Sequence, residues 1–416
     1  MQSRGLVYKS ALVPLVHTKG HCIAAGMTYS GRMAVYIHGI GTAVPTQAYT
    51  QDYALAFMRE HVATTRRAAI TLQRIYRHSG IHKRHSVIEE LAPGAPSGPF
   101  FDADEARLLN PSTQVRNAIY AEVSAPLWTM AATRAMQQAA VKPADITHVV
   151  TASCTGFFAP GPETHLVKAL NLSPRTQAFH LGFMGCYAAF PALRLAQMIA
   201  AADAQATVLI VCLELCTLHL QFTEDTDALL SASLFADGAG AAIVRAAPPP
   251  ANRPAFRVQA LSTARTPIGE EDMRWTIGDT GFDMTLSSRV PVLIERYLRE
   301  VLAPYAISDG VYPDWDIWAV HPGGRAILDA VQSAGVVPDA ALAASRDTLR
   351  EFGNMSSATI WFVLQRIMQQ VEDPGSVIAM AFGPGLTVET GVLEWMPARA
   401  PADVREQHHA DLVAST

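Results

Sequence analysis

The chain has 416 residues, of which 50% are hydrophobic and 17% are charged, and its formal net charge is -5 at pH 7. A chain of this size and composition can bury a large core and can form two domains or one large duplicated domain. The small negative charge predicts no nucleic-acid partner and no anionic membrane surface. No apolar run reaches the length that spans a membrane.

The cysteine content predicts a reducing compartment, the cytoplasm. The five cysteines are odd in number and form no C-x-x-C pair, which argues against a disulfide framework. Cys212 and Cys216 lie four residues apart, but no neighbouring pair of histidines or cysteines completes a zinc site. We therefore expect no bound metal.

The two ends of the chain differ in composition from the rest. The short apolar run in residues 1–32 is interrupted by Pro14, and no clear cleavage motif follows it. A disordered extension, or a start codon placed too early, is therefore favoured over a signal peptide, with Met27 and Met33 as alternative starts. The sequence at the other end of the chain, residues 398–416, predicts a flexible tail.

Strands and helices are predicted to alternate along the first half of the chain, residues 33–247, from the spacing of apolar residues. The expected elements are a strand at 34–40, mostly helical sequence at 51–87, a loop at 91–112, a helix at 115–140, strands at 147–152, 176–181, 206–211 and 241–245, and a helix at 188–202. Such alternation predicts mostly parallel sheets that are covered by helices.

The second half, residues 254–397, repeats this pattern after a proline-rich candidate linker at 248–250. The expected elements are strands at 256–262, 316–320 and 377–382 and helices at 290–302, 325–334, 339–351 and 358–370. We therefore predict a five-layered α/β/α/β/α sandwich made of two pseudo-symmetric halves. In this arrangement Cys186 and Asn354, each at a helix start in its own half, lie near each other.

A cysteine, Cys186, lies where the predicted strand 176–181 turns into the predicted helix 188–202. Gly182 and Gly185 allow backbone angles there that a side chain would forbid. The first amides of a helix favour an anion, so we predict that this position lowers the pKa of the Cys186 thiol and makes it a nucleophile. Taken alone, the residue is equally well explained as a small buried apolar side chain.

His321 and Asn354 are the candidate partners of this cysteine. His321 ends a predicted buried strand in a Pro-Gly-Gly turn, and functional groups gather at the carboxyl ends of strands in open α/β sheets. Asn354 follows Gly353 at a helix start, where asparagine is also a common N-cap. Each residue has an ordinary structural explanation, but the three together predict a catalytic site.

A basic window between residues 66 and 88 contains no acid. It comprises Arg66, Arg67, Arg74, Arg77, His78, His82, Lys83, Arg84 and His85. A patch of one sign in an acidic protein suits a phosphate-bearing ligand, although an ordinary basic surface explains it as well.

Four motifs occur in order along the chain: Gly185-Cys186, His321-Pro322-Gly323-Gly324, Gly353-Asn354-Met355-Ser356-Ser357 and the segment from Phe382 to Thr390. With these motifs the chain resembles the type III polyketide synthases, the chalcone-synthase-like enzymes of the thiolase superfamily, and the resemblance implies that the layered sandwich is thiolase-like. The resemblance extends from about Met33 to Trp395. Ketoacyl synthase III enzymes differ at the histidine motif and the glycine loop, and the catalytic glutamate motif of hydroxymethylglutaryl-CoA synthase has no match here.

The resemblance implies a role for each of the three catalytic candidates. Cys186 takes a starter acyl group from CoA as a thioester, and His321 forms an ion pair with its thiolate. His321 and Asn354 together stabilise the enolate that forms when malonyl-CoA loses carbon dioxide. A donor of this kind contributes about 3–4 kcal/mol. Acyl-CoA and malonyl-CoA are substrates, and no cofactor or metal is expected.

The resemblance also implies residues that bind substrate. These are Arg74, Arg77 and His78 for the CoA phosphates, Gly383, Pro384 and Gly385 for the cyclisation pocket, Cys154 and Ser356 for the cavity wall, and Phe222 and Met284 at the gatekeeper positions. Met284 replaces an aromatic residue, which argues against an aromatic starter.

The flanking sequence is similar to bacterial alkylresorcinol and alkylpyrone synthases, which take fatty acyl starters. We therefore expect a homodimeric, cytoplasmic enzyme that extends an aliphatic starter repeatedly and cyclises the chain to a resorcinol, a pyrone or a related aromatic product. The alternatives are a single-round condensing enzyme of the ketoacyl synthase III kind and a non-catalytic protein that binds acyl-CoA on the same fold.

Overall fold

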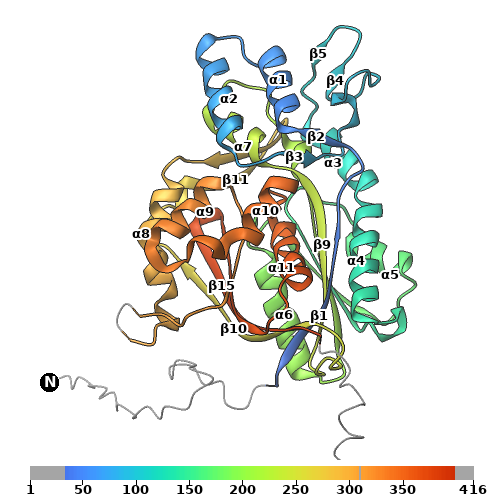
Figure 1. Ribbon diagram of the computed structural model, residues 1–416. Helices are drawn as coiled ribbons and strands as arrows, with labels where there is room; N and C mark the ends of the chain where they lie inside the picture. The colour runs from blue at the N-terminus through green and yellow to red at the C-terminus, as the bar shows by residue number, and fades with distance from the viewer. Residues whose placement is uncertain (1–32, 309–310, 399–416) are drawn as a thin grey trace, which may run out of the picture.

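A nine-stranded sheet carries strands from both halves of the chain (Figure 1). The computed structural model describes residues 33–308 and 311–398, so the predicted extension at 1–32 and nearly all of the predicted tail lie outside the described residues. The strands of this sheet are β1 (Val35–Ala43), β6 (His148–Ser153), β7 (Gln177–Gly182), β8 (Thr207–Leu215), β9 (Asp237–Arg245), β10 (Ala255–Arg265), β13 (Ile317–Val320), β14 (Gly375–Gly383) and β15 (Thr387–Met396). Their order is β13-β14-β15-β10-β1-β9-β8-β6-β7.

The sheet is mixed, so the prediction of mostly parallel strands is wrong. Among its pairs, only β6 with β7, β6 with β8, and β13 with β14 are parallel. Helices lie between these strands in the sequence, as parallel pairing requires. β14 and β15 are instead joined by a short turn at 384–386, which can connect only antiparallel neighbours.

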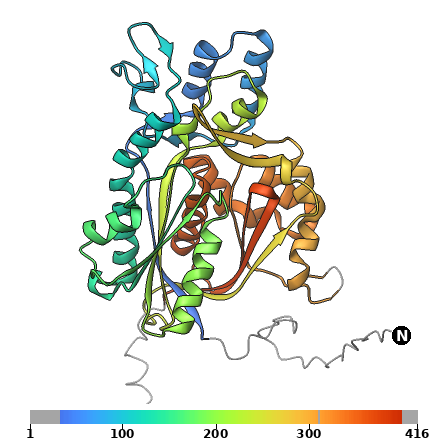
Figure 2. The same cartoon turned by 180° about the vertical axis from the view of Figure 1, so that it is seen from behind.

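The structure has five layers, in which three layers of helices alternate with two groups of strands; β10 and β1 join the two groups into the one nine-stranded sheet. The helices of these layers are α4 (Ala125–Ala139), α6 (Ala189–Ala202), α8 (Val290–Leu302), α9 (Arg325–Val331) and α11 (Thr359–Gln370). In the centre, α6 and α11 share one buried apolar cluster with β6, β8 and β9 on one side and β13, β14 and β15 on the other. Outside them, α4 covers the first group of strands, and α8 and α9 cover the second (Figures 1 and 2). These layers confirm the predicted α/β/α/β/α sandwich.

Several shorter elements complete the fold. They are α1 (Gln51–His61), α2 (Arg66–His78), α3 (Thr113–Val123), α5 (Pro162–Ala169), α7 (Thr226–Leu234), α10 (Ala343–Phe352) and the two-stranded pairs β2 (Ala48–Thr50) with β3 (Lys83–His85), β4 (Phe101–Asp102) with β5 (Arg107–Leu108), and β11 (Met273–Gly278) with β12 (Gly281–Leu286). The predicted helix at 115–140 is two helices, because Pro126 in the first turn of α4 interrupts the hydrogen bonding. The sequence did not predict α5, α7 or the β11–β12 hairpin.

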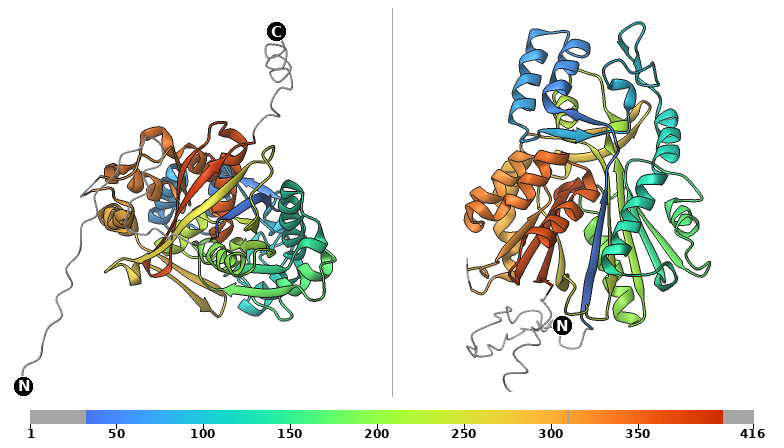
Figure 3. Two further views of the ribbon diagram at one scale, coloured as in Figure 1. Left: turned by 90° about the horizontal axis from the view of Figure 1, so that it is seen from below. Right: turned by 45° about the vertical axis from the view of Figure 1, so that its right-hand side comes forward.

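Several short elements lie above one end of the sandwich (Figures 1 and 3). Figure 3 shows α1 and α2 above the ends of the strands, beside α7 and the β11–β12 hairpin that Figure 1 labels. α1 and α2 match the helical sequence predicted at 51–87, which ends near Gly80 as expected. The carboxyl ends of β6 and β13 point to this region, so the candidate residues that follow them meet here.

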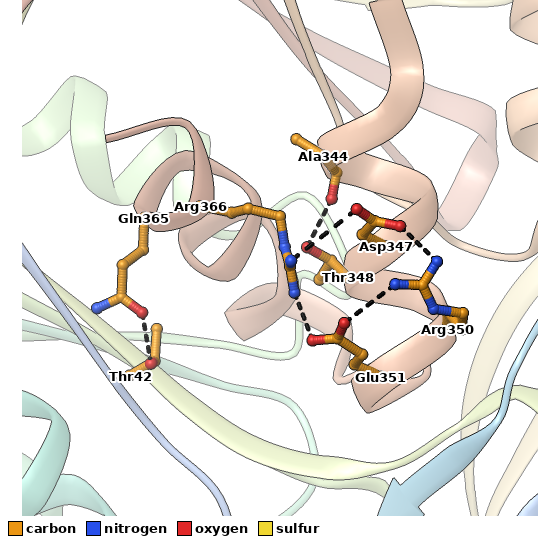
Figure 4. A network of polar contacts seen from close by, with 8 residues as sticks. All are labelled: Thr42, Ala344, Asp347, Thr348, Arg350, Glu351, Gln365 and Arg366. Atoms are coloured by element: carbon orange, nitrogen blue, oxygen red, sulfur yellow. Dashed lines mark hydrogen bonds and ion pairs between the residues drawn. The ribbon is translucent and has the colours of Figure 1, made fainter. Parts of the chain in front are cut away.

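An ionic network holds α10 against α11, just before the loop that carries Asn354 (Figure 4). Arg366 of α11 lies 2.6 Å from Glu351 and 4.0 Å from Asp347, and Arg350 lies 2.6 Å from Asp347 and 3.1 Å from Glu351. Burial alone would raise the pKa of Glu351, but the hydrogen bonds and charges of Arg366 and Arg350 lower it. The network therefore stabilises the ionised carboxylate.

We predict that Arg366→Met lowers the free energy of unfolding by about 1 kcal/mol at pH 7, because Glu351 loses its less exposed partner. The pKa of Glu351 is lower in the folded protein than the value of about 4.3 expected in the unfolded chain, so the ionised carboxylate stabilises the fold above this pH. This stabilisation is lost as the pH falls through the pKa of the folded protein. Thermal unfolding of wild type and variant should therefore converge in acid. Arg350→Met, at a more exposed side chain, is the control with the smaller effect. An equal difference at pH 3 and pH 7 would contradict the role of Glu351.

Candidate active site

The turn between β7 and α6 holds Cys186 in a strained backbone. Phe183 and Gly185 have φ values of +59° and +78°. A Cβ atom at Gly185 would lie 2.4 Å from Cδ of Pro384, so a larger residue cannot occupy this position. The Ala188 amide donates to the Gly185 carbonyl at 3.0 Å and closes the turn. Cys186 therefore lies just before α6, as predicted.

Cys186 lines a cavity of about 410 Å³, a volume within the range of small-molecule sites. Both halves of the chain supply its wall. Cys154, Met284, Ser356 and Pro384, which were predicted to bind substrate, all line it, together with Cys216 and Phe235. Phe235, Cys216 and Cys186 also form a small buried apolar cluster against which Met284 packs.

Asn354 comes from the second half and is buried, with 2% exposure; neither it nor His321 is among the residues that line the cavity. Its Nδ2 donates to the Gly323 carbonyl at 3.0 Å, and its Oδ1 accepts from the Ser356 amide at 2.8 Å. Burial raises the pKa of the Cys186 thiol, and the nearby Ser356 and Asn354 side chains offset part of this rise. The predicted proximity of Cys186 and Asn354 is thus present in the structure.

His321 follows β13 and is buried, with 1% exposure. Its amide donates to the Met380 carbonyl of β14 at 2.8 Å, and its carbonyl accepts from the Gly323 amide at 3.0 Å. Neither ring nitrogen has a hydrogen-bond partner among the described residues. Since buried polar atoms are normally paired, this imidazole is available to a reacting group. Through Gly323, His321 and Asn354 belong to one hydrogen-bonded loop cluster.

The protonation states differ from those that the sequence predicted. Burial raises the pKa of Cys186 to about 11; the Ser356 and Asn354 hydrogen bonds lower it, and the charge of Glu214 raises it. Burial lowers the pKa of His321 to about 3. The prediction that the helix start lowers the pKa of Cys186 is therefore wrong for the protein alone, because desolvation outweighs the helix amides. Both shifts favour the uncharged forms, a neutral thiol and a neutral imidazole, over an ion pair.

Glu214 is a buried acid at this site for which the sequence predicted no role. It lies on β8 with no exposed surface and accepts from the Cys154 amide at 2.9 Å, the Thr155 hydroxyl at 2.8 Å and the Ser357 hydroxyl at 2.5 Å. Burial raises its pKa, although these hydrogen bonds lower it. Glu214 thereby ties the end of β6 to the loop that carries Asn354. The only signal in the sequence was an acid within an apolar strand.

Aromatic residues close one side of the cavity. The rings of His219 and Phe282 stack with their centroids 3.9 Å apart, and Trp275 packs edge-on against both. The Trp275 Nε1 donates to the Cys154 carbonyl at 2.8 Å, and the His219 Nε2 lies 2.7 Å from the Thr155 carbonyl. The sequence did not predict this wall, because Trp275 and Phe282 reach the cavity only through the unpredicted β11–β12 hairpin.

The three predicted CoA-binding residues lie outside the cavity. Arg74, Arg77 and His78 are exposed on α2 and are not among the residues that line it. α2 ends beside Gly80, where a Cβ atom would lie 3.4 Å from the side chain of Arg325, the first residue of α9. The basic helix thus ends next to the turn that carries His321.

Other predicted residues have different positions. Phe222 does not line the Cys186 cavity but faces a second, smaller apolar cavity with Tyr49 and Tyr53. Gly383 and Gly385 flank Pro384 without lining the cavity. A Cβ atom at Gly383 would lie 2.4 Å from the Tyr187 ring, so glycine lets this loop pack on the Cys186 turn.

Arg84 also departs from its prediction as part of a basic surface, because only 8% of it is exposed.

Within residues 33–308 and 311–398, no three histidine, cysteine, aspartate or glutamate side chains are grouped as metal ligands would be. No helix in the same ranges is long and apolar enough to cross a membrane.

Comparisons with known proteins identify the family of the chain. The model of the N-terminal domain of chalcone and stilbene synthases matches residues 26–248, and that of their C-terminal domain matches residues 259–397. Among solved structures, PKS-I from the brown alga Ectocarpus siliculosus is similar at 27% identity and a TM-score of 0.79, covering 88% of this chain and 100% of its own.

Two microbial enzymes are also similar. The 1,3,6,8-tetrahydroxynaphthalene synthase of Streptomyces coelicolor A3(2) is 26% identical with a TM-score of 0.76, covering 87% of this chain and 100% of its own. A type III pentaketide synthase from Neurospora crassa is 26% identical with a TM-score of 0.73, covering 86% and 99%. The chain therefore belongs to the chalcone and stilbene synthase family, the type III polyketide synthases, and is a condensing enzyme of the acyltransferase type.

Proposed function

We propose that the protein loads an aliphatic acyl group from acyl-CoA onto Cys186 and extends it repeatedly with malonyl-CoA before cyclisation. One observation carries this proposal above the others. A buried thiol lies at the wall of a 410 Å³ cavity and the Asn354 side chain acts on its pKa, and this asparagine shares a loop cluster with a buried histidine whose ring nitrogens have no partner among the described residues.

Loading begins with a neutral thiol, so the proton must leave as the sulfur attacks. The neutral His321 imidazole has a free nitrogen that can accept this proton. The Cys186 sulfur forms a bond to the acyl carbon, the carbon–sulfur bond to CoA breaks, and the CoA thiolate leaves with the proton from His321. The desolvated site favours a neutral thioester over a buried thiolate.

Extension uses His321 again, now together with Asn354. Malonyl-CoA loses carbon dioxide, and the electron pair of the broken carbon–carbon bond moves to the thioester oxygen as an enolate. One Nδ2 hydrogen of Asn354 is bound to Gly323, which leaves the other to donate to this oxygen together with a His321 N–H. The enolate carbon attacks the Cys186 thioester, the Cys186 sulfur leaves as a thiolate, and this thiolate takes the extended acyl group back from CoA, whose thiolate leaves, to start the next round.

The cavity wall supports an aliphatic starter and repeated extension. Met284 offers a flexible apolar side chain at the wall, and the rigid group of Trp275, His219 and Phe282 closes one side. A relative named as a pentaketide synthase favours several extensions over the single round of a ketoacyl synthase III. Product mass separates these two functions, because repeated extension adds two carbons at each round.

We also propose that the enzyme is a homodimer that pairs through β7. This strand is the edge of the nine-stranded sheet and is exposed over nearly its whole length, as the burial of its residues shows. Phe179 on β7 and the nearby Phe157 are each 39% exposed. An exposed edge with apolar side chains favours pairing with another chain, and β7 leads directly into the Cys186 turn.

The proposed chemistry predicts different losses for two variants. Cys186→Ala should abolish covalent labelling by radioactive acyl-CoA and all chain building, whereas Cys216→Ala, a matched cysteine of the same cavity, should retain the label. Asn354→Ala should retain the label but lower malonyl-CoA decarboxylation roughly 100- to 1,000-fold, because one oxyanion donor is lost. Peptide mass spectrometry and release of labelled carbon dioxide measure the two steps. Equal loss of both steps in Asn354→Ala would contradict its assigned role.

The proposed dimer predicts that Phe179→Glu gives a monomer at micromolar concentration, because it places a charge on the paired edge. Light scattering coupled to gel filtration measures the mass. Ile70→Glu, at a side chain that is 58% exposed on α2, is the control and should remain dimeric. A monomeric wild type, or a dimeric Phe179→Glu variant, would refute pairing through β7.

A further inference from the structure

Arg84 is a buried cation that the proposed chemistry does not use. It lies on β3 and forms no ion pair with any described residue within 4 Å, although it packs over the Tyr76 ring at 5.9 Å. The sequence analysis placed Arg84 in the basic window, but the Arg84 side chain is buried, whereas the arginines of α2 are exposed. A buried charge is costly unless it is hydrogen-bonded, so the partners of Arg84 indicate its purpose.

The hydrogen bonds of Arg84 go to the end of α7. Its Nη1 donates to the Ala232 carbonyl at 2.7 Å and to the Phe235 carbonyl at 2.6 Å. Its Nε donates to Oε1 of Gln51 at 3.0 Å, and the Nε2 of Gln51 donates to the Ser233 carbonyl at 2.7 Å. The last carbonyls of a helix have no partner within the helix, and the planar guanidinium supplies donors in a fixed geometry. Arg84 and Gln51 thus hold the segment 232–236 from one side.

Asn354 holds the same segment from the other side. Its amide donates to the Leu234 carbonyl at 2.9 Å, and its carbonyl accepts from the Ala236 amide at 2.9 Å. Gly353 has a φ of +72°, and a Cβ atom there would lie 2.8 Å from Cγ of Arg84. The absence of a side chain at Gly353 thus lets Arg84 and the segment 232–236 pack directly against the loop that carries Asn354.

We propose that Arg84 is a positioning residue for the decarboxylation step, which it serves by fixing the backbone of Asn354 through the segment 232–236. The inference rests on the proposed function. Arg84 does not line the Cys186 cavity, so its effect on the reaction passes through Asn354 and through Phe235, which does line it. A small displacement of a donor is sufficient to slow a reaction strongly, because its geometry must match the developing charge.

The test compares Arg84→Met with Arg84→Lys in the full-length enzyme. Arg84→Met should lower the kcat of malonyl-CoA decarboxylation roughly 10- to 100-fold, with KM and the rate of acyl loading on Cys186 changed by less than about threefold. Arg84→Lys should recover part of the loss, since an ammonium group supplies donors without the fixed fork. A purely structural role would not separate decarboxylation from loading.

Arg116 offers a matched control. It is fully buried and also donates to backbone carbonyls, at 2.6 Å from Leu218 and 3.0 Å from Leu220, but it does not contact the segment 232–236. Arg116→Met should lower thermal stability as Arg84→Met does, and it should affect loading and decarboxylation in parallel.

The outcomes separate the two proposals. A parallel loss of loading and decarboxylation in Arg84→Met, or a selective loss in Arg116→Met, would overturn the role of Arg84. If Arg84→Met does not fold, the same comparison on Arg84→Lys decides: a selective decrease supports the role, and a parallel decrease overturns it. A wild type that releases no carbon dioxide from malonyl-CoA would refute the proposed function itself, whereas an active wild type with unselective variants refutes only the inference about Arg84.

Discussion

The two halves of the chain meet where the backbone of Asn354 pairs with the end of α7, and the buried Cys186 lies at this boundary. Neither half can form the site alone. The first supplies the thiol on the turn before α6, and the second supplies the amide and the imidazole on loops that follow α10 and β13. The central layer of α6 and α11 fixes the distance between these loops, because both helices share one apolar cluster with strands of each half.

Burial at this boundary determines the electrostatics of the site. Desolvation raises the pKa of Cys186 and lowers that of His321, which favours the uncharged form of both groups. Glu214 adds to this effect at Cys186 and connects the first half to Ser357 of the second. A neutral thiol and a neutral imidazole with unpaired nitrogens suit a substrate that brings its own charge in the carboxylate and the phosphates.

The sequence predicted the parts of the site that depend on local geometry. Cys186 follows a strand between glycines, His321 ends a strand, and Asn354 starts a helical segment, and each of these patterns is visible within a few residues. The repeat between the halves also predicted that Cys186 and Asn354 lie close together. The five layers followed from the alternation of strands and helices.

Properties that arise from long-range packing could not be predicted in this way. The pKa of Cys186 depends on burial by residues from both halves, and its direction was predicted wrongly. Arg84 has the sequence context of a surface arginine, but its partners at 232 and 235 are distant in the chain. Trp275 reaches the cavity through a hairpin whose strands carry no clear alternation of apolar residues, and Phe222 points to a different cavity.

The pH dependence of Cys186 alkylation tests most directly whether burial keeps the nucleophile neutral. Iodoacetamide reacts with the thiolate, and peptide mass spectrometry can follow the rate at Cys186 alone in the substrate-free enzyme. With a pKa of about 11, the rate should rise continuously between pH 7 and pH 10 without reaching a plateau. A plateau with a midpoint below pH 8 would show a thiolate paired with an imidazolium, and it would contradict the account of a neutral, desolvated pair.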